Sequence, residues 1–225
     1  MDEPKILIGL DFSMASREVI ELLLDDVEDP ALFQEIARTN AGRPEILQLL
    51  YEHEDTPEDV RGSIAGLLHV PAKAPAAVVC RKKSQEAGAQ NIMSRIQSLG
   101  VGERIQLALK GGREIRSILV KDTNKEVMLS VLDNQKITDT EIEMIARSRS
   151  IPDEALRRIA KNREWLKNYA VMHALVTNPK TPPGISVGMV GDLRLKDLVI
   201  LEKNKNVSDM IRSVAKKLLT ARRPK

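Results

Sequence analysis

The fold class is decided by the stretch Val171-Met172-His173-Ala174-Leu175-Val176-Thr177-Asn178-Pro179-Lys180-Thr181-Pro182. Val171 and Leu175 are four residues apart, so they lie one above the other on one face of a helix. Asn178 follows three residues later, and asparagine tolerates the left-handed conformation that often ends a helix. Pro182 suits the start of the next helix, because a proline in the first turn costs no hydrogen bond. The stretch therefore predicts a short helix, a tight turn and a second helix.

The same spacing recurs along the chain, in full or in part. It occurs at Phe33, Ala37, Asn40 and Pro44 and at Val127, Val131, Asn134 and Thr138; Val60, Ile64, Leu67 and Pro71 lack the Asn, and Asp197, Leu201, Asn204 and Ser208 lack the first apolar residue. Each helix is too short to bury its apolar face alone and needs neighbours, as in a helical solenoid. We therefore expect an all-α fold, an α-solenoid of short antiparallel helices. A compact helical bundle is the alternative, because the spacing between the units is irregular.

Two segments resemble a known repeat family. Asn178-Pro179-Lys180-Thr181-Pro182, preceded by the apolar helix, resembles the leucine-rich-repeat-variant signature Asn-Pro-x-Thr-Pro. Asp55-Thr56-Pro57-Glu58-Asp59-Val60-Arg61 resembles the other half of that repeat, and Asp122 to Val127 keeps its Asp-to-Val spacing. The resemblance covers residues 29–71 and 104–220 and extends to HEAT-like repeats, so it implies a superhelix of paired helices. Some members carry an iron–sulfur module near the N-terminus, which a chain with one cysteine does not share.

Composition agrees with a helical protein and narrows its chemistry. Among 225 residues there are two Phe, two Tyr and one Trp, and a core of small aliphatic residues suits helices better than a sheet sandwich. Cys80 is the single cysteine, which excludes an internal disulfide and an all-cysteine metal cage; we expect it to be a small buried side chain. The acidic start at residues 1–5 does not resemble a signal peptide, and no apolar stretch is long enough for a membrane helix. We expect a cytoplasmic protein without membrane insertion.

Charge is distributed unevenly along the chain. Residues 1–60 contain 16 Asp and Glu against 4 Lys and Arg, a net charge of −12, whereas residues 61–225 carry +15. The segment around residues 70–88 is rich in Pro and Ala, as in a semi-rigid connector. We therefore expect acidic N-terminal helical repeats in 1–70, a linker or long inter-repeat loop in 71–90, and a basic C-terminal array in 91–225. Self-association of the acidic and basic regions is a further expectation.

The sequence contains no recognisable catalytic, cofactor-binding or metal-binding pattern. The histidines at positions 53, 69 and 173 lie far apart and lack ligand spacing. Gly100-Val101-Gly102 and Gly111-Gly112 lack the spacing of phosphate-binding loops, so we expect helix–helix turns in which glycine supplies a positive φ. Gly184 and Gly188 predict close helix packing. The sequence thus predicts no catalytic residue, no cofactor and no metal.

One segment combines cations with the only tryptophan. Residues 161–169 read Lys-Asn-Arg-Glu-Trp-Leu-Lys-Asn-Tyr, and we expect Asn162 to cap a helix that continues past Tyr169. Two rows of apolar residues on that helix favour a core position for Trp165. Alternatively, Trp165 faces a concave rim where cations bind phosphate or a nucleic-acid base stacks on the indole. The candidate ligand-binding surface consists of Arg157, Arg158, Lys161, Arg163, Trp165 and Lys167.

The favoured function is a non-enzymatic helical-repeat scaffold that binds a protein through a charged groove or face, with an acidic protein as one candidate partner. The alternative is a nucleic-acid-binding solenoid, similar to HEAT-like DNA glycosylases in its basic array but without their chemistry. That alternative would use the candidate surface and the basic tail, namely Lys216, Lys217, Arg222 and Arg223. A catalytic helical-repeat enzyme is a third class, which sequence spacing does not reveal.

Overall fold

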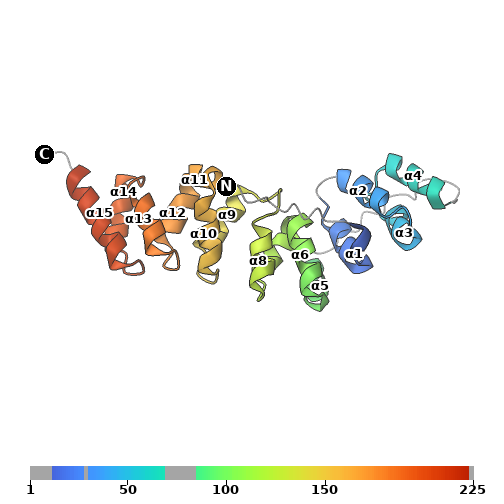
Figure 1. The fold of residues 1–225 in the computed structure, drawn as a ribbon, viewed down its shortest axis with the longest axis horizontal. Helices are drawn as coiled ribbons and strands as arrows, with labels where there is room; N and C mark the ends of the chain where they lie inside the picture. The colour runs from blue at the N-terminus through green and yellow to red at the C-terminus, as the bar shows by residue number, and fades with distance from the viewer. Residues whose placement is uncertain (1–11, 28–29, 69–84, 223–225) are drawn as a thin grey trace, which may run out of the picture. The chain divides into compact units, whose positions relative to one another are not determined.

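All regular structure in the described part of the chain is helical. The computed structural model describes residues 12–27, 30–68 and 85–222, with side chains from residue 92 onward in the third range. These residues form fifteen α-helices and one short 3-10 helix, and they contain no strand (Figure 1). The expected all-α class is therefore confirmed. No helix in the same ranges is both long and apolar enough to span a membrane.

The chain divides into two compact units, an N-terminal unit up to Leu119 and a C-terminal unit from Val120. The expected linker at residues 71–90 falls largely outside the described residues, as do His69 and Cys80; its last six residues belong to a helix that begins at Gln85. Residues 91–119, expected in the basic array, belong to the N-terminal unit.

The N-terminal unit is a set of short amphipathic helices whose order in space differs from their order in the chain. Its described elements are η1 (Phe12–Met14), α1 (Arg17–Asp25), α2 (Ala31–Thr39), α3 (Pro44–Glu52), α4 (Glu58–Leu68), α5 (Gln85–Ser98), α6 (Val101–Lys110) and α7 (Arg113–Leu119). Helix α1 packs against both α3 and α6. The guanidinium of Arg95 on α5 also pairs with Glu21 and Asp25 on α1, at 3.2 and 2.7 Å. Helix α1 therefore lies between α2–α4 on one side and α5 and α6 on the other (Figure 1).

The acidic turn that resembles half of a repeat completes the end of α3. The hydroxyl of Thr56, which is buried, donates to the backbone oxygen of Leu50 at 2.6 Å. The guanidinium of Arg61 donates to the backbone oxygen of His53 at 2.9 Å. Both bonds satisfy carbonyl groups that a helix leaves free at its C-terminus. Val60, between them, is buried in the core.

Gly111 and Gly112 permit close contact between chain segments and do not supply a positive φ. The carboxylate of Asp26 accepts a hydrogen bond from the backbone amide of Ile115, at 3.0 Å, and so caps α7 from a distant part of the chain. A Cβ on Gly112 would lie 2.3 Å from the backbone oxygen of Asp26. Gly111 and Gly100 have φ of −61° and −64°, and Gly112 is also outside the left-handed region. The expectation of positive φ was wrong, because the short distance between the chain segments excludes a side chain here.

The C-terminal unit has one continuous aliphatic core. Its helices are α8 (Lys125–Val131), α9 (Asp139–Arg147), α10 (Asp153–Lys161), α11 (Arg163–Lys167), α12 (Tyr169–Thr177), α13 (Pro183–Val190), α14 (Leu195–Lys203) and α15 (Asp209–Arg222). Buried side chains from Met128 to Leu219 pack together, and each described helix from α9 onward contacts helices near it in the chain. Several caps follow the sequence, such as Thr138 with Glu141 at the start of α9.

Three of the repeated asparagines lie at helix ends. Asn40, Asn178 and Asn204 are C-caps with φ of −109°, −78° and −77°, so the expected left-handed conformation is wrong. The Asn178 side-chain amide donates to the backbone oxygens of Ala146 and Ser148, at 2.7 and 3.0 Å, and its oxygen accepts from the Lys180 amide. Asparagine is favoured here because it can donate and accept at once.

The expected long helix through Trp165 is interrupted at Asn168. The backbone amide of Asn168 donates to Trp165, which ends α11, while its side-chain oxygen accepts from Ala170 and starts α12. A side chain that bonds its own backbone competes with helix continuation. Trp165 is half-buried and packs against the core of the C-terminal unit.

Gly184 and Gly188 on α13 do not mediate helix packing. A Cβ added at either position would meet nothing within 4 Å, and both residues are exposed. The predicted close contact at these positions was wrong, because α13 buries its opposite side through Ser186, Met189 and Val190.

Candidate functional site

The structure places the expected ligand-binding residues on two consecutive helices. Arg157, Arg158 and Lys161 lie on α10, and Arg163, Trp165 and Lys167 lie on α11. The five cations are exposed and Trp165 is half-buried. Helices α10 and α11 contact one another, so the residues share one region of the C-terminal unit.

Three of these five cations are already paired with carboxylates. Arg157 bonds Asp153 at 3.2 Å, and Lys167 bonds Glu164 at 2.6 Å. Arg158 bonds Asp133 at 2.9 Å and also donates to the backbone oxygen of Leu129 at 3.1 Å, within the last turn of α8. Exposed ion pairs contribute little to stability, but they reduce the charge that a phosphate would meet. Arg158 therefore also stabilises the C-terminal end of α8.

A concavity of about 720 Å³ between α8 and α10 has the same balanced charge. Its charged lining comprises four cations and four carboxylates: Lys125, Arg157, Arg158 and Lys161 with Glu126, Asp133, Asp153 and Glu154. The hydrogen bond from Lys125 to Glu154 raises the pKa of that lysine. With equal numbers of opposite charges, this concavity provides no strong attraction for a polyanion.

The basic excess of the C-terminal unit lies further along the chain. Residues 120–177 contain 10 Lys and Arg against 9 Asp and Glu, whereas residues 178–225 contain 11 against 4. The net charge of +7 in the second range belongs to the segment that forms α13, α14 and α15. Electrostatic attraction of an acidic partner is therefore strongest there.

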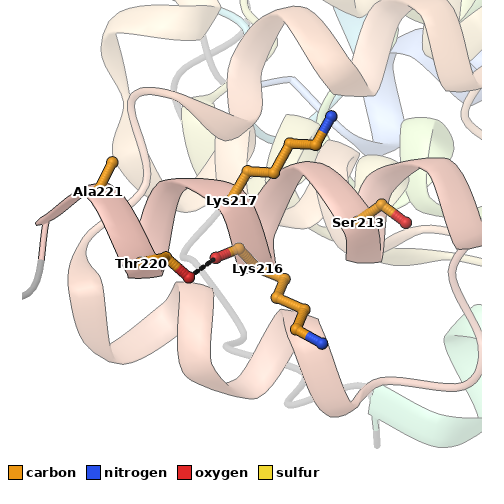
Figure 2. A pocket seen from close by; sticks show the side chains of 5 residues that line it. All are labelled: Ser213, Lys216, Lys217, Thr220 and Ala221. Atoms are coloured by element: carbon orange, nitrogen blue, oxygen red, sulfur yellow. Dashed lines mark hydrogen bonds between the residues drawn. The ribbon is translucent and has the colours of Figure 1, made fainter.

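Helix α15 contributes a shallow hollow of about 590 Å³, lined by Ser213, Lys216, Lys217, Thr220 and Ala221. Figure 2 shows Lys216 and Lys217 pointing away from one another, and the Thr220 hydroxyl donates to the backbone oxygen of Lys216 at 3.0 Å. The Thr220 hydroxyl therefore has its hydrogen-bond acceptor within its own helix. The hollow contains two separate cations on a largely apolar lining and no convergent polar group.

Helix α14 carries the exposed apolar surface of this basic region, which we call the α14 face: Leu195, Lys196, Val199, Ile200 and Lys203. Leu195, Val199 and Ile200 are 48%, 39% and 63% exposed, respectively. Positions i, i+1, i+4, i+5 and i+8 of a helix share one side. The opposite side of α14 is buried through Leu198 and Leu201.

A polar cluster that sequence reasoning missed joins α12 to the start of α14. The hydroxyl of Tyr169 donates to Asp197 and accepts from the Arg194 backbone amide at 3.1 Å. The Arg194 guanidinium lies 4.3 Å from the centroid of the Tyr169 ring, and His173 lies 3.9 Å from the Asp197 carboxylate. Burial, followed by the bond to Asp197, raises the pKa of Tyr169.

One signal for this cluster is present in the sequence. Asp197 occupies the position where the repeated pattern has a buried apolar residue, as at Val127 and Val171. A carboxylate on an inward side of a helix needs a partner, which Tyr169 supplies. The sequence does not indicate which residue that partner is, because the two are 28 positions apart.

The basic tail has a structural contact as well. Arg222, near the end of α15, donates to the backbone oxygens of Leu193 and Gly191 after α13. Arg222 therefore stabilises a helix end in the way that Arg158 does. Arg223 lies outside the described residues.

Within residues 12–27, 30–68 and 92–222, no three His, Cys, Asp or Glu side chains gather closely enough to hold a metal ion. No family model, curated protein or solved structure matches the chain.

Proposed function

We propose that the chain is a non-enzymatic α-solenoid scaffold that binds a protein partner through its C-terminal unit. The single observation that carries this proposal is the α14 face, where three partly exposed aliphatic side chains lie beside two lysines. A leucine-rich-repeat-variant or HEAT-like relationship is part of the proposal. Its support is the chain of short helices that contact near neighbours and end at bonded asparagines.

The exposed aliphatic surface favours a protein over a nucleic acid. Full burial of one such side chain stabilises a complex by about 1.5–3 kcal/mol, so three half-exposed ones contribute about 2–4 kcal/mol. Nucleic-acid interfaces rely on cations and stacking aromatics. The described part of residues 178–225 contains no Phe, Tyr or Trp.

Nucleic-acid binding is the second candidate, favoured by the +7 charge of residues 178–225 and by Lys216 and Lys217 on the exposed side of α15. It predicts an affinity that falls linearly with the logarithm of the salt concentration. Retention of the full chain on duplex or single-stranded oligonucleotides at low salt would support it.

The scaffold proposal is tested by selecting binders to the immobilised full chain from a displayed library of random peptides. The expected result is a recurrent peptide class whose binding saturates and persists at physiological salt, because apolar contacts are not screened. Failure to enrich any class, together with salt-sensitive oligonucleotide binding, would replace this function by the second candidate.

A further inference from the structure

We propose that the α14 face docks an acidic amphipathic helix of the partner protein, an inference that rests on the proposed function and identifies its site. The occupant would contribute apolar side chains at helical spacing and carboxylates beside them. This mode of recognition places the apolar side of one helix on an apolar surface of another protein.

The dimensions of the α14 face suit one short helix. Helix α14 has nine residues and is about 13 Å long, which matches a partner segment of about three turns. Leu195 and Val199 lie along one side of the face and Ile200 along the other, because residues four apart align and residues one apart diverge by about 100°. Lys196 and Lys203 lie between these aliphatic side chains.

The charge of the α14 face selects an acidic occupant. Lys196 and Lys203 are exposed and form no ion pair within the described residues. The carboxylates on α14 are Asp197, bonded to Tyr169, and Glu202, which is half-buried. Lys205 follows the helix in the adjoining loop and is also exposed. Carboxylates of the partner would therefore pair with these lysines without competition from carboxylates in the described part of the chain.

The α14 face differs from the exposed surfaces of α9 and α10. On α9, Met144 is 69% exposed and is the one large hydrophobic exposed on that helix. On α10, exposed Arg157 and Arg158 are paired with carboxylates, and no large hydrophobic residue is exposed. Helix α14 combines exposed aliphatic residues with unpaired cations, which is the composition that an acidic amphipathic segment complements.

The test uses the full chain and the peptide class selected above, from a library long enough for about four helical turns. The enriched peptides should carry apolar residues at i, i+3 or i+4 and i+7 with Asp or Glu beside them. Ile200→Glu should weaken binding at least about tenfold, as expected for a central interface residue. Met144→Glu is the matched control for an exposed residue on another helix and should leave binding unchanged.

Charge reversal provides the decisive measurement. The double variant Lys196→Glu with Lys203→Glu should weaken the selected peptide at least about tenfold. The same peptide with its acidic residues changed to lysine should then bind the double variant better than the original chain. Lys121→Glu, at an exposed cation before α8, is the control and should change neither affinity. Circular dichroism checks that each variant remains folded.

Three outcomes would overturn this inference. Peptides without acidic residues, or peptides unaffected by Ile200→Glu and by the double variant, would place the site elsewhere and leave the scaffold function standing. Self-association of the full chain that sedimentation shows to be abolished by Ile200→Glu would make a second copy the occupant. Absence of any enriched peptide would count against the scaffold function itself.

Discussion

The side-chain amide of Asn178 donates to the backbone oxygen of Ala146 at 2.7 Å, and so joins the end of α12 to the last turn of α9. The same amide reaches the backbone oxygen of Ser148. Helix ends leave carbonyl groups without partners, and a buried carbonyl without a hydrogen bond is costly. One residue therefore ends its own helix and completes a neighbouring one.

Asn178→Asp should destabilise the C-terminal unit by about 2–3 kcal/mol. The carboxylate keeps the acceptor for the Lys180 amide but replaces the donor with negative charge beside two carbonyl oxygens. Urea unfolding followed by fluorescence of Trp165, the only tryptophan, measures the loss. Asn204→Asp is the matched control, because Asn204 uses only its acceptor, toward Asn206. Equal losses in both variants would contradict the inter-helix role.

Gly112→Ala should destabilise the N-terminal unit by about 2–3 kcal/mol, since overpacking forces the backbone to move. The added Cβ would overlap the backbone oxygen of Asp26 at 2.3 Å and disturb the cap on α7. Thermal unfolding measured by circular dichroism tests this expectation. At Gly42 in the same unit an added Cβ meets nothing, so Gly42→Ala should change stability far less.

Gly188→Ala should stabilise the C-terminal unit by about 0.5–1 kcal/mol. Gly188 lies within α13, its φ is outside the left-handed region, and an added Cβ meets nothing within 4 Å. Glycine in a helix loses more conformational entropy on folding than alanine. A lower urea midpoint for the variant would show that the surface of α13 is covered by another part of the chain.

Tyr169→Phe should lower stability by about 1 kcal/mol at neutral pH, through loss of the bond to Asp197. Burial and that bond raise the pKa of Tyr169 above its ordinary value of 10.0. As pH rises past about 10, the unfolded chain therefore releases this proton before the folded chain does, and stability falls. The variant has no such proton, so the difference in unfolding free energy between the original protein and the variant should narrow at alkaline pH. Urea unfolding across that pH range measures this difference. A difference that stays constant would contradict the link between the Tyr169 proton and stability.

Arg158→Ala should cost about 1–1.5 kcal/mol, whereas Arg157→Ala should cost less than about 0.5 kcal/mol. Both arginines lie on α10 and form exposed ion pairs, but Arg158 also donates to the backbone oxygen of Leu129. Urea unfolding of the two variants makes the comparison directly. Losses of equal size would show that the bond to α8 contributes nothing measurable.

Local features of the sequence predicted much of the helical framework. Pro44 lies at the start of α3, Thr138 and Asn162 cap α9 and α11, and buried Val127 and Val171 confirm the apolar spacing. These features depend on neighbours within one or two turns. The interruption of the helix at Asn168 was not predicted, because an asparagine side chain can either interrupt a helix or point to solvent. The surrounding packing decides between the two.

The candidate site was less predictable because charge counts do not show which charges are paired. Arg157, Arg158 and Lys167 lie in a basic stretch of the sequence, but their carboxylate partners reduce its field. The partner of Arg158, Asp133, is 25 residues away. Conversely, the pattern from Asp197 to Asn204 predicted a helix, but only packing decides which of its aliphatic side chains, such as that of Ile200, remain exposed.

The amino-acid sequence alone determined that this protein is built from short helices, because apolar spacing, caps and first-turn prolines act over a few residues. Tertiary structure decided where α1 lies, why Gly112 must be glycine, and which cations of the C-terminal unit are unpaired. Each of these depends on atoms brought together from distant positions, such as Asp26 with Ile115 and Tyr169 with Asp197. Distances between such atoms follow from the packing of the whole unit, which no local pattern contains.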